Sequence, residues 1–223
     1  MTSQTSELAA SLSADLGPVT PLPLPGAQLR RWGLIGGAAL VATIVMGIRH
    51  DWAASMVAWP VIGHTAVLAA VAGSGAWAAI RLATPGEALP RAVGWPLAFG
   101  AIWLAWMAVD VALAGASGTL SEAGFGWRCV VRAVIGAAVP GAVLLVMVRR
   151  AMPLMATPAA VALAASTAAA GGLAAEWMCP NMAAMHMLVW HAAPVLAVVV
   201  AATILGRALV GHLASTGRVS LLD

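Results

Sequence analysis

The stretch AVIGAAVPGAVLLVMVRR, residues 133–150, decides the fold class of this chain. Its first sixteen residues carry no charge, and they run directly into Arg149 and Arg150. About 20 apolar residues in a helix cross a bilayer, and arginines gather at the cytoplasmic end of such helices. Together with the few residues before it, this stretch predicts a membrane-spanning helix over 128–148.

The composition of the whole chain agrees with this prediction. Of its 223 residues, 62% are hydrophobic and only 9% are charged, and the mean hydropathy is +0.95. A soluble domain carries about 25% charged residues, so this chain cannot cover itself with a water-facing surface. The N-terminal sequence has no basic region ahead of its apolar residues and does not predict a signal peptide. We expect an integral membrane protein.

Six apolar segments have the length of a membrane span, and the breaks between them carry charged or turn-forming residues. The segments are 32–48, 56–80, 93–114, 128–148, 158–178 and 185–206. We therefore predict an all-α integral membrane protein with six transmembrane helices.

The arginines predict the orientation of these helices. Most of them lie on one side of the predicted spans, namely Arg30, Arg31, Arg81, Arg91, Arg149, Arg150, Arg207 and Arg218. By the positive-inside rule this side and both termini are cytoplasmic. Membrane orientation thus accounts for the positive charge, and we predict no nucleic-acid partner. The predicted organisation is a cytoplasmic tail over 1–29, a transmembrane bundle over 30–212 and a second cytoplasmic tail over 213–223.

The first tail contains a candidate amphipathic helix. Leu8, Leu12 and Leu16 recur every four residues, which places them on one face of a short helix. Three helical turns are marginal in water, so this helix would need a groove on a partner. The alternative is a disordered tail in which the leucines have no role, and the spacing does not decide between the two. A proline-rich linker, 17–26, joins the tail to the first span.

The topology places the two cysteines of the chain at the same depth. Cys129 lies 20 residues before the cytoplasmic turn 149–157, and Cys179 lies 22 residues after it. Both are therefore expected near the non-cytoplasmic face, on neighbouring helices. A structural disulfide, a redox or metal site, and two unrelated thiols are the alternatives at this point.

The first of these cysteines, Cys129, is predicted to be the more reactive thiol. A helix N-terminus and the neighbouring Arg128 and Arg132 favour its thiolate. Other ionisable residues belong to the same outer half of the bundle. Asp110 is expected to pair with Arg132, because a charge in lipid needs a partner, and Glu176 lies one turn inside the end of its helix.

Further sulfur and imidazole groups lie in EWMCPNMAAMHMLVWH, residues 176–191. On an ideal α-helix Met182, Met185 and His186 share one face, whereas His191 lies about 140° away from His186. One ion could bind both histidines only if this helix began irregularly. Cysteine, methionine and histidine together suit a soft cation such as Cu(I). Methionines on an apolar helix are more often packing residues, so both interpretations stay open.

No complete catalytic constellation is present. The GASG stretch, residues 115–118, is similar to the serine motif of rhomboid proteases. However, Ser117 is predicted in a loop, and His64 is the only histidine of the second span. Nucleophilic catalysis needs the serine and its base within hydrogen-bond reach, and nothing in the sequence fixes that geometry. We predict that the protein is not an enzyme.

The order and spacing of several features resemble those of a bacterial family, the negative regulators of sigma F (NrsF). The features are the tail SELAASLSADLGPV followed by prolines, the Arg-Arg pair before the first span, Cys129 at the start of the fourth span, and CPNMAAMHMLVWHAAP at 179–194. The resemblance covers nearly the whole chain.

This resemblance implies a membrane anti-sigma factor of the bacterial inner membrane. It would hold an extracytoplasmic-function sigma factor and release it under oxidative or heavy-metal stress. Carried onto this sequence, the sensor cysteines are Cys129 and Cys179, and the sigma-binding tail includes Leu8, Leu12 and Leu16. No resident cofactor is implied, and a soft or heavy metal ion would act as the signal. The alternative is a small membrane protein that binds or transports a soft, copper-like metal.

Overall fold

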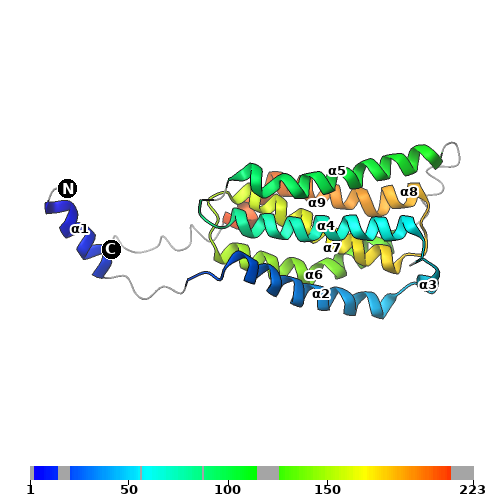
Figure 1. Ribbon diagram of the computed structural model, residues 1–223, viewed down its shortest axis with the longest axis horizontal. Helices are drawn as coiled ribbons and strands as arrows, with labels where there is room; N and C mark the ends of the chain where they lie inside the picture. Colours follow the sequence, from blue (N-terminus) through cyan, green and yellow to red (C-terminus); the bar gives the residue numbers. More distant parts are fainter. Residues whose placement is uncertain (1–2, 15–20, 56, 87, 115–125, 212–223) are drawn as a thin grey trace.

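Helices make up all the regular secondary structure in the computed structural model, which describes residues 3–14, 21–55, 57–86, 88–114 and 126–211 (Figure 1). A π-helical turn, Leu188–Ala192, joins two of them. The helices are α1 (Ser3–Ala14), α2 (Pro25–Gly47), α3 (Trp52–Ser55), α4 (Trp59–Leu82), α5 (Leu89–Ala114), α6 (Trp127–Arg150), α7 (Ala156–Met178), α8 (Ala184–Met187) and α9 (Ala193–Gly211).

Six stretches of helix are long and apolar enough to cross a membrane, which confirms the predicted fold class. They are Pro25–Gly47, Trp59–Leu82, Arg91–Leu113, Trp127–Arg150, Ala156–Met178 and Ala184–Gly206. The largest difference from the predicted segments is at the first span, where the helix begins at Pro25 instead of residue 32. Proline suits the first position of a helix, so α2 starts within the stretch assigned to the 1–29 tail.

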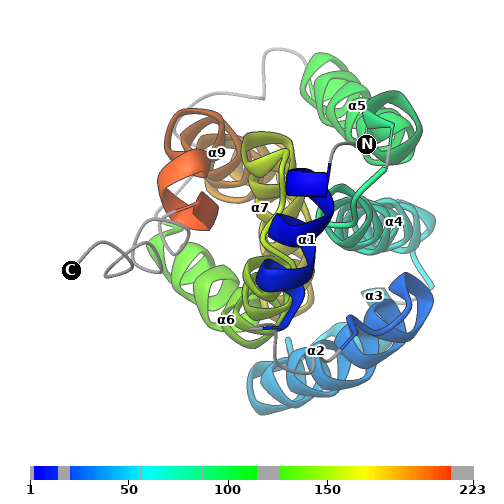
Figure 2. The same cartoon turned by 90° about the vertical axis from the view of Figure 1, so that its left-hand side faces the viewer.

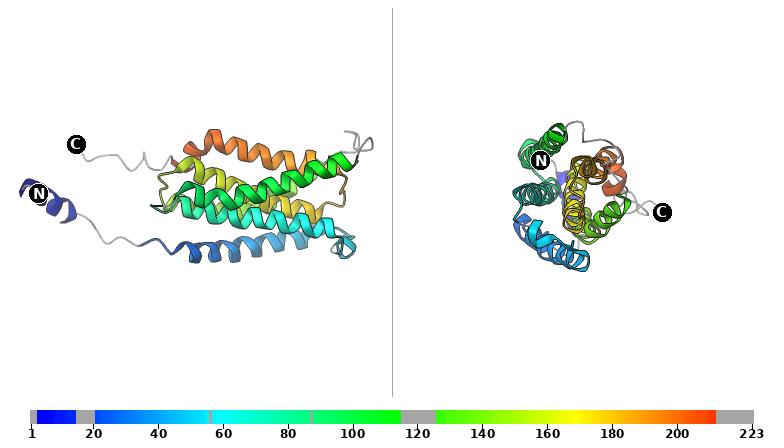
Figure 3. Two further views of the ribbon diagram at one scale, coloured as in Figure 1. Left: turned by 45° about the horizontal axis from the view of Figure 1, so that its top comes forward. Right: turned by 90° about the vertical axis from the view of Figure 1, so that its right-hand side faces the viewer.

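The most buried of the six spans is α7, and the other long helices surround it (Figure 2 and the right-hand view of Figure 3). Two thirds of its membrane window (67%) is buried, against 6% for α2. Its sequence is rich in alanine and glycine, and small residues let membrane helices approach closely. Gly171, for example, lies so near α6 that a Cβ there would stand 2.4 Å from the carbonyl oxygen of Ala133. The small side chains of α7 thus determine which helix occupies the centre.

The bundle has two ends with different chemistry. We call the end with Pro25 and Gly211 the tail end, and the end with α3 and α8 the cluster end (Figure 1). Apart from Gln28, the buried residues near the tail end are apolar in the described part of the chain, as in the cluster that contains Ile80, Leu144 and Val148. The buried histidines and cysteines lie toward the cluster end. Polar chemistry is therefore concentrated in one half of the bundle.

Candidate metal and thiol site

Four buried donor side chains converge at the cluster end. The Sγ atoms of Cys129 and Cys179 are 3.1 Å apart, and Nε2 of His186 lies 3.5 Å from the first and 3.4 Å from the second. His191 completes the group, in which one ligand atom from each residue lies within 4.8 Å of the others. All four side chains are at most 5% exposed. We call these four residues the Cys2His2 cluster.

The elements that position the cluster are the ends of three spans. Cys129 lies in the first turn of α6, and Cys179 is the residue directly after α7. The predicted equal depth of the two cysteines thus corresponds to direct contact between their thiols. They are free cysteines in this structure.

The π-helical turn explains how both histidines reach one site. In it the backbone N–H of Ala193 bonds to the carbonyl of Leu188, five residues back, where an α-helix would use four. The extra residue turns His191 toward the side of His186, and the two rings are 5.7 Å apart between centroids. The irregular helix start that the sequence analysis required is therefore present. Pro194 gives a physical reason, because proline has no N–H and clashes with the carbonyl four residues earlier.

The surroundings of the two thiols add a contact to the features on which the predicted order of reactivity was based. Arg128 is exposed, and the guanidinium of Arg132 donates to the carbonyl of Met178. The thiol of Cys129 donates a hydrogen bond to Cys179, and this bond holds the pKa of the Cys179 thiol below its ordinary value. This bond depends on how the ends of α6 and α7 pack, which the positions of the arginines and of the helix end along the chain do not show. The geometry favours the thiolate on Cys179, and the relative reactivity of the two thiols stays a prediction.

The predicted pair between Asp110 and Arg132 is wrong. Oδ2 of Asp110 lies 3.2 Å from Nε2 of His64. Asp110 belongs to α5, which packs on α4, whereas Arg132 belongs to α6, which packs on α7 and α2. The two residues have similar depth but lie on different sides of the bundle, which the counting of residues along each helix could not detect.

The backbone beside Cys179 is held by Arg49, which lies two residues after α2. The Arg49 guanidinium donates to the carbonyl of Pro180 (3.2 Å) and to both carboxylate oxygens of Asp51 (2.6 and 2.8 Å). This hydrogen bond lowers the pKa of Asp51 to about 2. The stabilising contribution of the pair is present above the unfolded pKa of 3.8 and is lost as the pH falls toward 2. Mild acid therefore leaves the pair intact.

The remaining predicted residues have separate positions. Glu176 is fully buried, and neither of its carboxylate oxygens has a hydrogen-bond partner among the described residues. Met182 lines a pocket next to the cluster, and Met185 is half-buried in α8. In α1, Leu8 is 59% exposed. The side chain of Leu12, all of Leu16 and the 213–223 tail lie outside the described residues.

The cluster fits a metal ion by its donor chemistry. Two thiolates and two imidazoles are a tetrahedral donor set for Zn²⁺, and they also suit softer ions. Neither ring nitrogen of His191 has a hydrogen-bond partner in the described part of the chain, although the ring is 4% exposed. A buried polar atom without a partner is costly, and metal ligation would satisfy it.

A comparison with protein families identifies the chain. The family described as negative regulator of sigma F, NrsF, matches residues 12–211. The chain belongs to the NrsF family. The family is described as a regulator of a sigma factor, which is not an enzymatic role. This description implies a sigma factor as the partner. Comparisons with curated proteins and with solved structures gave no match.

Proposed function

We propose that this NrsF protein holds an extracytoplasmic-function sigma factor at the inner membrane and releases it when an oxidant or a soft or heavy metal ion acts on Cys129 and Cys179. The observation that carries the proposal is the convergence of four buried donors in a member of a sigma-regulator family. An oxidant that takes two electrons and two protons would join the thiols, which are 3.1 Å apart, in a disulfide. A metal ion would be held by the same two cysteines after each thiol has lost its proton.

The proposed orientation places the Cys2His2 cluster outside the cytoplasm and the tail inside. The arginine distribution supports it, because Arg30, Arg31, Arg149 and Arg150 all lie near the tail end. The sigma factor would then bind near the tail, with Leu8, Leu12 and Leu16 as anchors in a helix-in-groove contact. Sensing and binding would take place at opposite ends of the bundle.

Helix α2 offers a physical connection between these two ends. At the cluster end, the backbone N–H of Arg49, two residues after α2, donates to the carbonyl of Trp177 (3.2 Å). Nearer the tail end, the indole N–H of Trp32 donates to the carbonyl of Pro140 (3.0 Å). Helix α2 packs mainly on α6 and is the least buried of the six spans, with 6% of its membrane window buried. A change around Cys179 would therefore move α2 more easily than the central helices, and α2 follows the tail in the chain.

The test is recovery of the sigma factor with the full-length protein from detergent-solubilised membranes. We expect recovery with the wild-type protein and its loss after treatment with diamide or Cd²⁺. The Cys129→Ser/Cys179→Ser protein should keep the sigma factor under both treatments. Absence of a sigma factor with untreated wild-type protein would overturn the proposal.

The role of the tail is tested in the same assay. The double variant Leu8→Glu/Leu12→Glu should lose the sigma factor, because it places charge on the predicted binding face. Ala10→Glu is the matched control, since residue 10 lies on the opposite face of α1 and is exposed. Equal recovery with both variants would exclude this face as the binding element.

A soft-metal transporter remains the second candidate, because the Cys2His2 cluster could hold its cargo. Transport needs polar groups along the whole path, and the buried core cluster of the tail half is formed by alanine, leucine, isoleucine and valine. Uptake of Cd²⁺ or Ag⁺ by proteoliposomes that contain the purified protein distinguishes the two candidates. A regulator should give no uptake above that of empty liposomes.

A further inference from the structure

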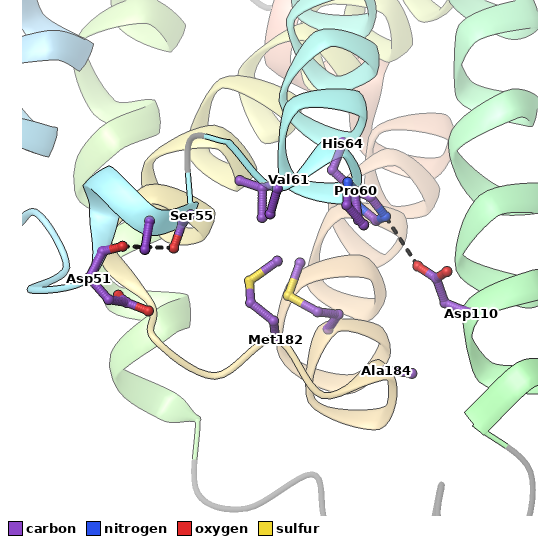
Figure 4. Close-up of a pocket in the computed structure, with 11 residues that line it drawn as sticks. Asp51, Ser55, Pro60, Val61, His64, Asp110, Met182 and Ala184 are labelled. Atoms are coloured by element: carbon purple, nitrogen blue, oxygen red, sulfur yellow. Dashed lines mark hydrogen bonds and ion pairs between the residues drawn. The ribbon is translucent and has the colours of Figure 1, made fainter.

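A pocket of about 560 Å³ lies at the cluster end, between α3, α4, α5 and α8 (Figure 4). The side chains of its wall include both charged and sulfur-containing groups. The lining residues with polar or sulfur-containing side chains are Asp51, Ser55, His64, Asp110, Met182 and Met187. None of these residues belongs to the Cys2His2 cluster.

His64 is buried, and only one of its two ring nitrogens has a hydrogen-bond partner in the described part of the chain. It is 3% exposed, and its Nε2 lies 3.2 Å from Oδ2 of Asp110. A carboxylate only accepts hydrogen bonds, so Nε2 carries the proton and Nδ1 carries the lone pair. Nδ1 has no partner among the described residues. A carboxylate that fixes the tautomer in this way is the usual second partner of a metal-bound histidine.

The ring of His64 is held in place by its neighbours. The ring of Trp106 packs edge-on against it, with 4.7 Å between centroids. Met182 extends into the pocket from the loop before α8, as Figure 4 shows, and Met187 at the end of α8 lines the same pocket. Two thioethers and one imidazole thus border a single cavity.

These donors select the class of cation. Ca²⁺ and Mg²⁺ require oxygen ligands, and Zn²⁺ binds thiolates, imidazoles and carboxylates. Thioethers bind soft ions, of which Cu(I) is the biological example. The carboxylate of Asp110, whose side chain is 37% exposed, places negative charge in the pocket wall, whereas the charge of Asp51 is offset by Arg49. The pocket is therefore suited to a soft cation of single charge.

We propose that this pocket binds a Cu(I)-type cation through Met182, Met187 and His64, and that it passes the ion to the Cys2His2 cluster. The open pocket is lined by Met182, Met187 and His64 and by none of the four cluster ligands, so an ion from solvent would reach the pocket first. Met187 directly follows the cluster ligand His186 in α8, so the two sites share a wall. The delivery role rests on the proposed metal-sensing function, whereas the cation site itself does not.

The site is tested by counting Ag⁺ ions bound to the full-length protein in detergent by native mass spectrometry. Ag⁺ has the charge and softness of Cu(I) and does not change its oxidation state. We expect two ions for the wild type and one for Met182→Leu/Met187→Leu. The matched control Met152→Leu, at the exposed turn of the tail end, should bind two.

Zn²⁺ provides the contrast in the same measurement. The wild type and the Met182→Leu/Met187→Leu protein should each bind one Zn²⁺, and Cys129→Ser/Cys179→Ser should bind none but keep one Ag⁺. Asp110→Asn should weaken Ag⁺ binding in the pocket by about 10–100-fold. A loss of this size is usual when a metal-bound histidine loses the carboxylate that accepts a hydrogen bond from its other ring nitrogen. An unchanged Ag⁺ count in the double methionine variant would overturn the site.

The delivery role is tested by the rate at which Ag⁺ protects the two cysteines from N-ethylmaleimide. The Met182→Leu/Met187→Leu protein should be protected more slowly but to the same final extent. Equal rates in wild type and variant would overturn delivery and leave the site intact. Neither measurement involves a sigma factor, so failure of the proposed function is recognised separately.

Discussion

The four donors of the Cys2His2 cluster come from three segments that each supply a different constraint. Cys129 is fixed by the first turn of α6, and Cys179 by the end of α7. The two histidines are brought together by a π-helical turn. Such turns occur at functional sites because they redirect a side chain at the cost of one strained turn. Each ligand is thus positioned by backbone structure before any ion arrives.

The first prediction concerns a single ligand of the cluster. His186→Ala should weaken Zn²⁺ or Cd²⁺ binding by more than roughly 10–100-fold. That range is the usual effect of losing a residue that only orients a metal ligand, and His186 is proposed as a ligand itself. His186 contacts both sulfurs, at 3.5 and 3.4 Å. Isothermal titration with the detergent-solubilised protein measures the effect. His50→Ala, an exposed histidine, is the control and should bind as the wild type does.

The second prediction concerns Glu176. This fully buried carboxyl group has no hydrogen-bond partner among the described residues. Removing a buried polar group that has no hydrogen-bond partner should raise the free energy of unfolding by about 1–3 kcal/mol, because the cost of desolvating that group is avoided. Glu176→Leu should therefore raise the thermal unfolding midpoint in detergent, whereas the exposed Glu7→Leu should leave it nearly unchanged. A lower midpoint for Glu176→Leu would mean that the carboxyl group has a partner, such as a bound cation.

At the scale of elements, α7 organises the bundle through its small residues. Close approach is possible at Gly171 and at Gly75, where a Cβ would stand 3.0 Å from the backbone nitrogen of Ser166. The hydroxyl of Ser166 also donates to the carbonyl of Ala72 (2.7 Å) across the α4–α7 interface. The same close packing keeps Cys129 and Cys179 in contact, because they belong to the ends of α6 and α7.

The third prediction follows from this packing. In Gly171→Ala the new methyl group would meet the carbonyl of Ala133, so α6 and α7 must separate. Overpacking of this kind costs about 1–3 kcal/mol. The thermal midpoint and the yield of the Cys129–Cys179 cross-link should both fall. Gly37→Ala has open space and should be neutral or stabilising, so equal effects of the two variants would contradict this account.

The fourth prediction concerns the proposed movement of α2. Arg49→Gln removes the bonds from its guanidinium to Asp51 and Pro180. The sigma factor should then stay bound more strongly after diamide treatment, because only the backbone bond from residue 49 to Trp177 still links the segment around Cys179 to α2. The ratio of sigma factor recovered before and after treatment measures this coupling. Arg128→Gln, an exposed arginine at the same end, should keep the wild-type ratio.

At the scale of the molecule, an even number of spans places Pro25 and Gly211 at the same end (Figure 1). The fifth prediction is that this end is cytoplasmic. Green fluorescent protein fused after Asp223 should fluoresce, and alkaline phosphatase fused after Ala114 should be active, because each reporter works on only one side of the membrane. The reverse pattern would contradict the positive-inside argument.

Much of the fold could be predicted from local information. Hydropathy gave the six spans within a few residues at most ends, because a helix in lipid must be apolar along its whole length. Depth along each helix brought Cys129 and Cys179 to the same level. The partner of Asp110 could not be predicted in this way, because depth does not say which helices are neighbours. Only the packing of α5 on α4 gives His64 as its partner.

The sequence by itself determined the class of the protein, the number of its spans and the family to which it belongs. Hydrophobicity and charge decide these properties, and both can be read one segment at a time. The tertiary structure alone decided that His186 and His191 join the two cysteines, and that Met182, Met187 and His64 share a pocket. The reason is that lateral packing and a single inserted residue in a helix set the rotation of side chains, which periodicity in an ideal helix cannot supply.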